Sequence, residues 1–292
     1  MLRIKQGKGA GGKALMTTTL NTPDVLARIV AHKRQEVAER RGLQPEKLLE
    51  RSQYLDAPTL SLRQYLRRPE LSGIIAEFKR RSPSKGWINE FAPVERTTLG
   101  YMQAGASALS VLTDTEFFGG KNEDLTTARR FNLCPILRKD FVVDAYQLLE
   151  ARSLGADAVL LIASVLTPQE IRELGRQAQA LGLEVLLEVH DKEELDRSLD
   201  AAHDAIDLVG VNNRDLRDFS VSLERSLQLV EHLPAGLGRV AESGLRTAQD
   251  VATLRRAGFE GFLIGETFMR HGRPERACAA LVQQLRELSA AR

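Results

Sequence analysis

Eight short apolar runs, separated by stretches with helical periodicity, restrict the fold of this chain more than any other feature. Several runs are almost wholly apolar, as expected of parallel strands that are covered on both faces. Eight strand–helix units predict an α/β protein, a (β/α)8 TIM barrel of about 250 residues. The expected strands are residues 73–78, 108–113, 135–138, 158–162, 184–189, 208–212, 239–242 and 261–264.

The turns between the helices and the strands also repeat. Residues 105–108, 155–158 and 258–261 each begin with a glycine that can end a helix, and each leads into an apolar run. Glycine suits the left-handed conformation that commonly ends helices. The alternative fold is an open doubly wound sheet, but no G-x-G-x-x-G motif follows the first expected strand.

Residues 23–72 contain no strand pattern. A helix is expected over residues 23–42, with Val25, Ile29 and Val37 on its apolar stripe and Lys33 off that stripe. Two short helical segments follow, at 45–51 and 60–67. We expect these helices to cap the active-site end of the barrel, within one domain spanning residues 23–292. Residues 1–22 lack acidic side chains and are expected to be a disordered tail, with a transit peptide as the alternative.

Composition argues against several classes of function. The net charge is only +2, so bulk charge does not support binding to nucleic acid or to a membrane surface. No apolar run approaches the roughly 18 residues of a membrane span. Cys134 and Cys278 fit neither a disulfide framework nor a zinc motif, and we expect buried thiols in a reducing compartment, the cytoplasm. The histidines are scattered, so no metal site is expected.

Polar residues recur where the expected strands end, which is where (β/α)8 barrels carry their active sites. Any one of them alone is better explained by a solvated loop or a structural ion pair, but the recurrence favours a common site. Glu188 is the sharpest case, because it interrupts an apolar strand where a charge is costly unless it faces a polar cavity. The others include Glu77, Lys79, Lys139, Asn212, Glu242 and Ser243. His190 also follows its strand, but we expect a loop or cap residue there, because Asp191 fits an N-cap with Glu194 at capping-box spacing.

The loops after the last two strands are candidates for phosphate binding. Ser243-Gly244 and Gly265-Glu266 follow these strands, and barrels often hold phosphate there. Glycine lets the backbone approach a ligand closely, and amides at a helix start favour an anion. Simple tight turns are the alternative. A carboxylate beside a phosphate is unfavourable, so Glu266 is expected to contribute its backbone only.

Taken together, these segments resemble one family, the indole-3-glycerol phosphate synthases. The matching segments run in order from about residue 23 to 269: 75–84, 110–114, 118–120, 137–141, 186–190, 211–216, 241–244 and 263–266. The resemblance implies a carboxy-lyase of tryptophan biosynthesis. Its substrate, 1-(2-carboxyphenylamino)-1-deoxyribulose 5-phosphate, is cyclised, decarboxylated and dehydrated to indole-3-glycerol phosphate. The resemblance implies no cofactor, no nucleic-acid or membrane partner, and a monomer or weak homodimer.

The resemblance also implies catalytic roles. Lys139 would be the general acid that protonates the ribulose carbonyl, and Glu188 the general base of the dehydration. Lys79 would pair with the substrate carboxylate, and Glu77 would hold the lysines and the substrate hydroxyls. The remaining catalytic positions are Asn212 and Glu242, which would position the sugar, and Ser243, which would belong to the ring-side network.

Substrate-binding roles are implied for a second set of residues. Phe118 and Phe141 would contact the aromatic ring, Arg214 would lie near the anthranilate side, and the phosphate would lie on the amides of loops seven and eight. The full set is Ser82, Phe118, Phe141, Arg214, Gly244, Ile264, Gly265 and Glu266.

Two further expectations concern the site. A lysine acid works best with a pKa near neutrality, and Arg138 and Lys79 are the cations expected to lower that of Lys139. Residues 80–86 are expected to form a mobile flap.

Other functions remain open: another phosphate-binding barrel such as phosphoribosylanthranilate isomerase, or a non-catalytic binder of a phosphorylated metabolite. The isomerase is disfavoured because its chemistry calls for a Cys or Asp base where Glu77 and Lys79 stand.

Overall fold

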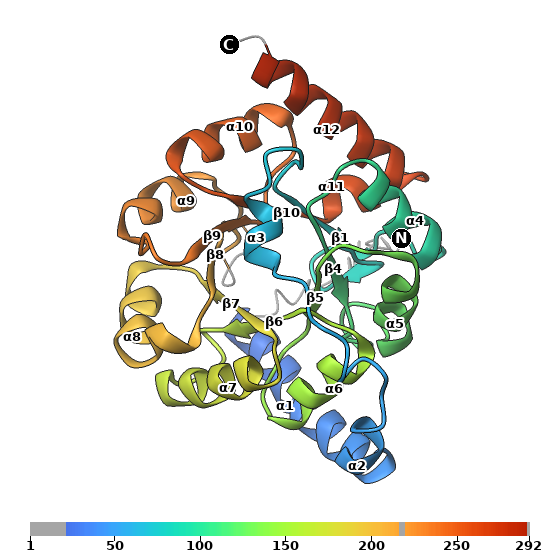
Figure 1. Cartoon of the computed structure of the whole chain (residues 1–292). Coiled ribbons are helices and arrows are strands. Elements are labelled where there is room, and N and C mark those ends of the chain that lie inside the picture. The colour runs from blue at the N-terminus through green and yellow to red at the C-terminus, as the bar shows by residue number, and fades with distance from the viewer. Residues whose placement is uncertain (1–21, 216–219, 291–292) are drawn as a thin grey trace, which may run out of the picture.

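The computed structural model describes residues 22–215 and 220–290, and in it eight parallel strands close into a barrel (Figure 1). Strand β1 pairs with both β4 and β10, which completes the closure. All eight predicted strands are confirmed, with bounds that differ by at most one residue. They are β1 (Ile74–Phe78), β4 (Ala108–Leu112), β5 (Ile136–Lys139), β6 (Ala158–Ile162), β7 (Glu184–Val189), β8 (Leu208–Asn212), β9 (Gly238–Glu242) and β10 (Gly261–Ile264).

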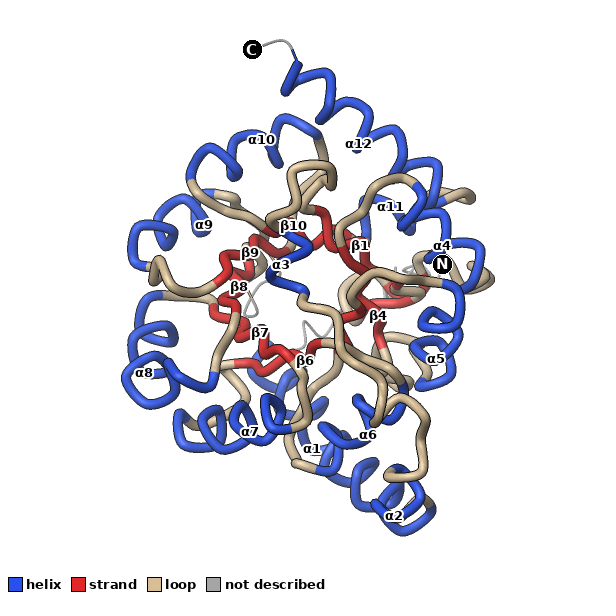
Figure 2. Tube along the Cα trace, viewed as in Figure 1, coloured by secondary structure: helices blue, strands red, loops and turns tan. Residues whose placement is uncertain are grey.

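Helices alternate with the strands and form the outer ring of the barrel (Figure 2). The predicted glycine turns are confirmed, because Gly105, Gly155 and Gly258 all have positive φ. The ring consists of α4 (Val94–Gln103), α5 (Asn122–Phe131), α6 (Tyr146–Leu154), α7 (Pro168–Ala180), α8 (Lys192–Ala202), α9 (Glu224–Leu229), α10 (Ala248–Ala257) and α12 (Pro274–Ala290). Shorter turns are η1 (His203–Ala205), η2 (Val230–His232) and α11 (Glu266–Met269).

Successive residues of each strand face opposite sides of the barrel wall. Leu137, Leu186 and Val240 belong to the apolar cluster inside the barrel, whereas a larger cluster lies between the strands and the helices. Two residues further along the same strands come Lys139, Glu188 and Glu242, which therefore point inward as well. The strand period thus brings these side chains to the mouth of the barrel.

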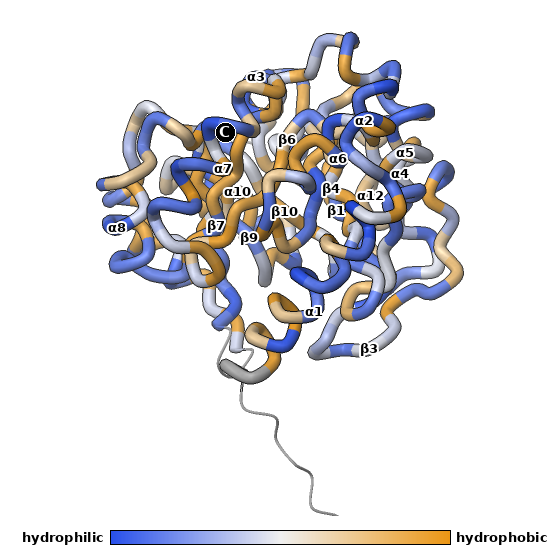
Figure 3. The backbone as a smooth tube through the Cα atoms, turned by 90° about the horizontal axis from the view of Figure 1, so that it is seen from below, coloured by the Kyte–Doolittle hydropathy of each residue, from blue (hydrophilic) through white to orange (hydrophobic). Residues whose placement is uncertain are grey.

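The N-terminal helices lie at both ends of the barrel (Figure 3). Helix α1 (Thr22–Leu43) crosses the C-terminal ends of the strands, as predicted, and α2 (Glu46–Leu49) follows it. Helix α3 (Leu62–Leu66) instead closes the opposite end, where Leu62 and Leu66 join the interior cluster. The space is available because Gly261 has no side chain; a Cβ there would lie 2.9 Å from Leu66 Cδ1. The expected cap is therefore α1, not the whole extension.

Other predictions about the chain have mixed outcomes. Residues 1–21 of the expected disordered tail lie outside the described residues, and residue 22 already begins α1. Residues 80–86 include part of a hairpin of β2 (Arg81–Ser82) and β3 (Gly86–Trp87), and the mobility of this segment stays a prediction. Across the described part of the chain, no helix has the length and apolar character that crossing a membrane requires.

Candidate active site

A cavity of about 410 Å³ lies at the C-terminal ends of the strands. Helix α1 forms part of its wall through Val25, Leu26 and Ile29. The structure brings every predicted site residue into the lining of this one cavity. These residues are Glu77, Lys79, Ser82, Phe118, Lys139, Phe141, Glu188, Asn212, Arg214, Glu242, Ser243, Gly244, Ile264, Gly265 and Glu266.

Lys139 lies at the centre of a group of carboxylates. Its Nζ is 2.8 Å from Glu188 Oε2 and 3.4 Å from Glu242 Oε2. Burial alone would lower the pKa of Lys139, but the negative charges of Glu188, Glu242 and Glu77 outweigh it and raise the pKa above its usual value. Lys139 is therefore held as an ammonium, with a proton available to an acceptor that enters the cavity.

The expectation that Arg138 lowers the pKa of Lys139 is wrong. Arg138 precedes Lys139 on strand β5, so its side chain points away from the barrel interior, towards the helices. Its guanidinium donates to the Gln147 carbonyl oxygen at 2.9 Å and to Glu150 Oε2 at 2.5 Å, both on α6. The same expectation for Lys79 is also wrong, because the Lys79 ammonium is paired with Glu77 Oε1 at 2.6 Å and the pKa of Lys139 is raised, not lowered.

The pKa values of Glu188 and Glu242 are shifted in opposite directions. Burial favours the neutral form of Glu188, but the charges of Lys139 and His190 overcome this and hold its pKa below the usual range. Burial raises the pKa of Glu242, and although Lys139 opposes the shift, repulsion from Glu188 and Glu77 adds to it. Glu188 is thus ionised at neutral pH, as a proton acceptor must be, whereas Glu242 retains its proton more readily.

His190 contributes more than the sequence suggested. The capping expected at Asp191 is confirmed, because the Glu194 N–H donates to Asp191 Oδ1 at 2.8 Å. The ring also lies between two carboxylates, with Nδ1 3.1 Å from Glu194 Oε2 and Nε2 3.6 Å from Glu188 Oε1. Asn212 Nδ2 donates to Glu188 Oε1 at 3.1 Å, so Glu188 is held from two sides.

Two glycines make room for the carboxylates. A Cβ on Gly210 would lie 2.0 Å from Glu242 Oε1, and one on Gly265 would lie 2.3 Å from Glu77 Oε1. Gly210 was not predicted as a site residue. A glycine inside a buried strand often marks a close approach of another group, and that signal was available in the sequence.

The other walls of the cavity are aromatic and cationic. The rings of Phe118 and Phe141 have centroids 5.9 Å apart and are tilted by 40°. Arg214 Nη2 lies 3.5 Å from Glu266 Oε2, so the Glu266 carboxylate is engaged by a cation. Arg246 and Arg270 also line the cavity, and sequence reasoning did not single them out.

The loops after β9 and β10 have the backbone that a phosphate site requires. Ser243, with a φ of 65°, is the one non-glycine residue of the described chain with positive φ, and Gly244 follows with 81°. Such strained conformations cluster at binding and catalytic sites. No described residue accepts a hydrogen bond from the amide of Gly244 or of Gly265. These two amides can therefore serve an anion.

The family model of indole-3-glycerol phosphate synthase matches residues 26–281. The chain belongs to this family. The indole-3-glycerol phosphate synthase of Bacteroides thetaiotaomicron is 48% identical over 252 residues, which cover 86% of this chain and 95% of the relative. That of Variovorax paradoxus is 44% identical over 266 residues, covering 89% and 99%. Membership of the indole-3-glycerol phosphate synthase family confirms the resemblance and makes the chain a carboxy-lyase of tryptophan biosynthesis.

Solved structures of other proteins share the fold at lower identity. The structure of thiamine phosphate pyrophosphorylase from Pyrococcus furiosus matches with a TM-score of 0.54 and 18% sequence identity. The match covers 78% of this chain and 99% of that one. A likeness at this level of identity shows the barrel architecture alone.

Asp140, which separates Lys139 from Phe141, gives a prediction about stability. Burial would raise its pKa, but Lys33, Arg138 and a hydrogen bond from Thr113 lower it to about 2. Between about pH 4 and pH 2, the folded protein thus keeps the Asp140 carboxylate ionised, whereas the unfolded chain takes up a proton there. The resulting stabilisation, about 2 kcal/mol at about 1.4 kcal/mol per pKa unit, is present above about pH 4 and is lost as the pH falls towards 2.

We expect the free energy of unfolding to fall more steeply below pH 4 in the wild type than in Asp140→Asn. Urea unfolding at several pH values between 5 and 2 measures both slopes. Parallel curves for the two proteins would contradict the depressed pKa of Asp140.

Proposed function

We propose that the side chains of this cavity convert 1-(2-carboxyphenylamino)-1-deoxyribulose 5-phosphate to indole-3-glycerol phosphate. The observation that carries the proposal is Lys139, a partly buried ammonium that contacts two carboxylates whose pKa values are shifted in opposite directions. The proposal rests on this geometry together with membership of the family. The reaction needs a proton donor for a carbonyl and a proton acceptor for a dehydration, and the cavity offers both.

The two anionic ends of the substrate determine how it lies. We place the phosphate on the amides of Gly244 and Gly265, and the carboxylate near Lys79. The aromatic ring then lies against Phe118 and Phe141. Holding both ends folds a flexible chain so that its reacting carbons meet, and such orientation can contribute roughly 7–11 kcal/mol. In this arrangement Arg214 lies on the anthranilate side, and Ser82, Ile264 and Glu266 complete the lining.

The chemical steps follow from the protonation states. The aryl carbon that bears the carboxylate attacks the ribulose carbonyl carbon, while Lys139 delivers a proton to the carbonyl oxygen. Carbon dioxide leaves, and the electrons of its bond restore the aromatic ring. In the dehydration, Glu188 accepts the proton that the new ring loses, and a lysine ammonium of the cavity donates the proton with which the hydroxyl leaves as water. Asn212, which donates to Glu188, and Glu242 position the sugar, and Ser243 supports the ring-side network.

We also propose that the enzyme works in the cytoplasm as a single-domain monomer or weak homodimer over residues 23–292, without a cofactor or a nucleic-acid partner. Burial raises the pKa of both thiols, Cys134 and Cys278, to about 12, and neither forms a disulfide. Such inert, reduced thiols fit a reducing compartment. The low net charge of +2 supports the absence of a nucleic-acid partner.

A direct assay tests the proposed reaction. Purified protein mixed with the carboxyphenylamino substrate should produce indole fluorescence at a rate that saturates with substrate. Isomerisation of phosphoribosylanthranilate without formation of an indole would support the isomerase instead. Tight binding of indole-3-glycerol phosphate without turnover would support a non-catalytic binder.

The phosphate loop gives a separate prediction. Gly244 has a φ of 81°, and a Cβ there would lie 2.4 Å from Val221 Cγ1, so Gly244→Ala should shift the loop. Hydrogen bonds to charged groups contribute about 1.5–3 kcal/mol, so we expect KM to rise at least about tenfold, with a smaller change in kcat. Inhibition by inorganic phosphate should weaken by a similar factor.

The matched control for Gly244→Ala is Gly236→Ala, because a Cβ on Gly236 would meet no atom within 4 Å. Steady-state kinetics of both variants, with and without inorganic phosphate, provide the comparison. Unchanged phosphate inhibition in Gly244→Ala would place the phosphate elsewhere in the cavity.

A further inference from the structure

Charged side chains from α1, β5 and α6 form a closed circuit of ion pairs beside the cavity. Lys33 Nζ lies 2.9 Å from Glu36 Oε2 and 3.0 Å from Asp140 Oδ1. Asp140 Oδ2 lies 3.3 Å from Arg138 Nη2, which is 2.5 Å from Glu150 Oε2. Arg40 joins Glu150, at 3.2 Å, to Glu36 and completes the circuit. We call these six residues the Lys33 circuit: Lys33, Glu36, Arg40, Arg138, Asp140 and Glu150.

Lys33 connects helix α1 to the ends of two barrel strands. Its side chain is fully buried, and its Nζ also lies 2.9 Å from Asp114 Oδ2, just after β4. The sequence prediction that Lys33 lies off the apolar stripe of α1 is wrong. Ile29, Lys33 and Val37 are spaced by four residues and are all buried, so they share one face of the helix.

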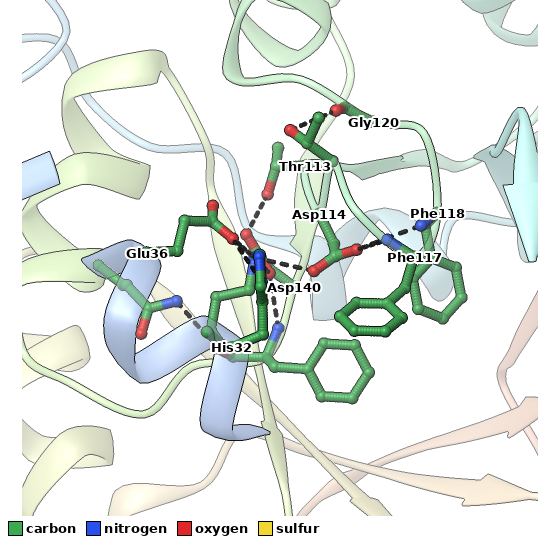
Figure 4. A network of polar contacts seen from close by, with 12 residues as sticks. His32, Glu36, Thr113, Asp114, Phe117, Phe118, Gly120 and Asp140 are labelled. Carbon is green, nitrogen blue, oxygen red and sulfur yellow. Dashed lines mark hydrogen bonds and ion pairs between the residues drawn. The ribbon is translucent and has the colours of Figure 1, made fainter. Parts of the chain in front are cut away.

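The two aspartates that bind Lys33 hold the backbone of the aromatic residues (Figure 4). Asp114 Oδ1 accepts hydrogen bonds from the N–H groups of Phe117 at 2.8 Å and Phe118 at 3.2 Å. Asp140 Oδ1 accepts one from the N–H of Phe141 at 2.8 Å. Each of these two aspartates thus holds the backbone of one member of the Phe118–Phe141 pair.

Stability alone is a weak explanation for such a cluster. Replacing buried ion pairs by apolar residues of similar volume is often neutral or stabilising, because taking charges out of water is costly. What the charges provide is geometry, since an ammonium that contacts three carboxylates fixes their mutual positions. Here they also place Ile29, one turn before Lys33, against the cavity.

We propose that Lys33 is a positioning residue for the aromatic end of the substrate. By joining α1 to Asp114 and Asp140, it sets the spacing of Phe118 and Phe141 and holds the wall formed by α1. Lys33 does not touch the substrate and acts only through these groups. The inference rests on the proposed function, because that function places the aromatic ring against the two phenylalanines.

Two fragments of the substrate separate positioning from simple anchoring of α1. In Lys33→Met, which keeps the apolar stem of the side chain, inhibition by anthranilate should weaken about tenfold and KM should rise by a similar factor. Inhibition by inorganic phosphate, which binds at the far end of the cavity, should not change. Loss of folded enzyme alone would lower only the apparent kcat, because KM and inhibition constants do not depend on enzyme concentration.

A charge-balanced variant covers the case in which Lys33→Met does not fold. Lys33→Met leaves buried carboxylates without their cation, whereas K33M/D114N removes one charge of each sign. Asparagine retains the oxygen that accepts from Phe117 and Phe118, so the double variant should lose anthranilate inhibition as the single one does. Lys33→Arg, which keeps the charge, should restore part of it.

Arg34→Met is the matched control, because Arg34 is the neighbouring cation on α1 and is exposed. Its turnover, and its inhibition by anthranilate and by phosphate, should match those of the wild type. If the folded Lys33 variants bound anthranilate like Arg34→Met, Lys33 would be an anchor only and the inference would be overturned. A wild type that binds anthranilate and phosphate but forms no indole would instead overturn the proposed function.

Discussion

Replacing Lys139 by alanine should lower kcat/KM at least about a hundredfold. General acid catalysis typically contributes about 10²–10⁴-fold, and Lys139 is the ammonium that contacts both Glu188 and Glu242 in the cavity. The loss should appear mainly in kcat, since the proton is transferred in the ring-closing step. Steady-state measurement of indole fluorescence gives both constants.

The control for this variant is Lys192→Ala. Lys192 is exposed on α8 and pairs across the helix surface with Asp196, at 2.5 Å. Exposed pairs of this kind contribute about 0–1 kcal/mol, so stability and turnover should remain near those of the wild type. Near-normal turnover of Lys139→Ala would exclude Lys139 as the acid.

Glu188→Gln should lower kcat about a hundredfold or more, because glutamine cannot accept the proton that is lost in the dehydration. KM should change less, since glutamine keeps the shape of the side chain and can still accept from Asn212. The substitution also removes the negative charge that raises the pKa of Lys139 the most. Activity that requires a protonated Lys139 should therefore be lost at lower pH in the variant than in the wild type.

Profiles of kcat and kcat/KM against pH test both parts of this prediction. Glu193→Gln, an exposed change on α8 outside the cavity lining, is the control and should follow the wild-type profile. An alkaline limb at the same pH in Glu188→Gln and the wild type would show that Glu188 does not set the pKa of Lys139.

The barrel could be predicted because its signal is local. Each strand, such as 158–162, is an apolar run that its own residues define, and the glycine turns repeat the same chemistry. The position of α3 could not be predicted in this way. The spacing of Leu62 and Leu66 shows that one face of the helix is buried, but it does not show which end of the barrel that face covers.

The site residues could be predicted, but their electrostatics could not. A polar residue at a strand end, such as Glu188, is visible in one sequence window. The pKa of Lys139 depends instead on carboxylates from three other strands, and their distances exist only once the barrel closes. Arg138 misled because adjacency in sequence suggested proximity, although strand alternation separates it from Lys139. Lys33 was missed because a charged residue was assumed to lie off an apolar stripe.

The position of α3 has a consequence for the order of events during folding. Ser61 Oγ donates to Glu184 Oε1 across 123 residues of sequence, and Arg67 Nε donates to Glu260 Oε1 across 193 residues. Contacts at such separations form slowly, because the intervening chain must first be ordered. On the ribosome the N-terminal segment emerges first, yet α3 and its flanking residues can complete their contacts only after the chain has been made to about residue 260. Residues 60–67 thus remain without some of their partners during most of synthesis, and full docking of this segment marks completion of the barrel.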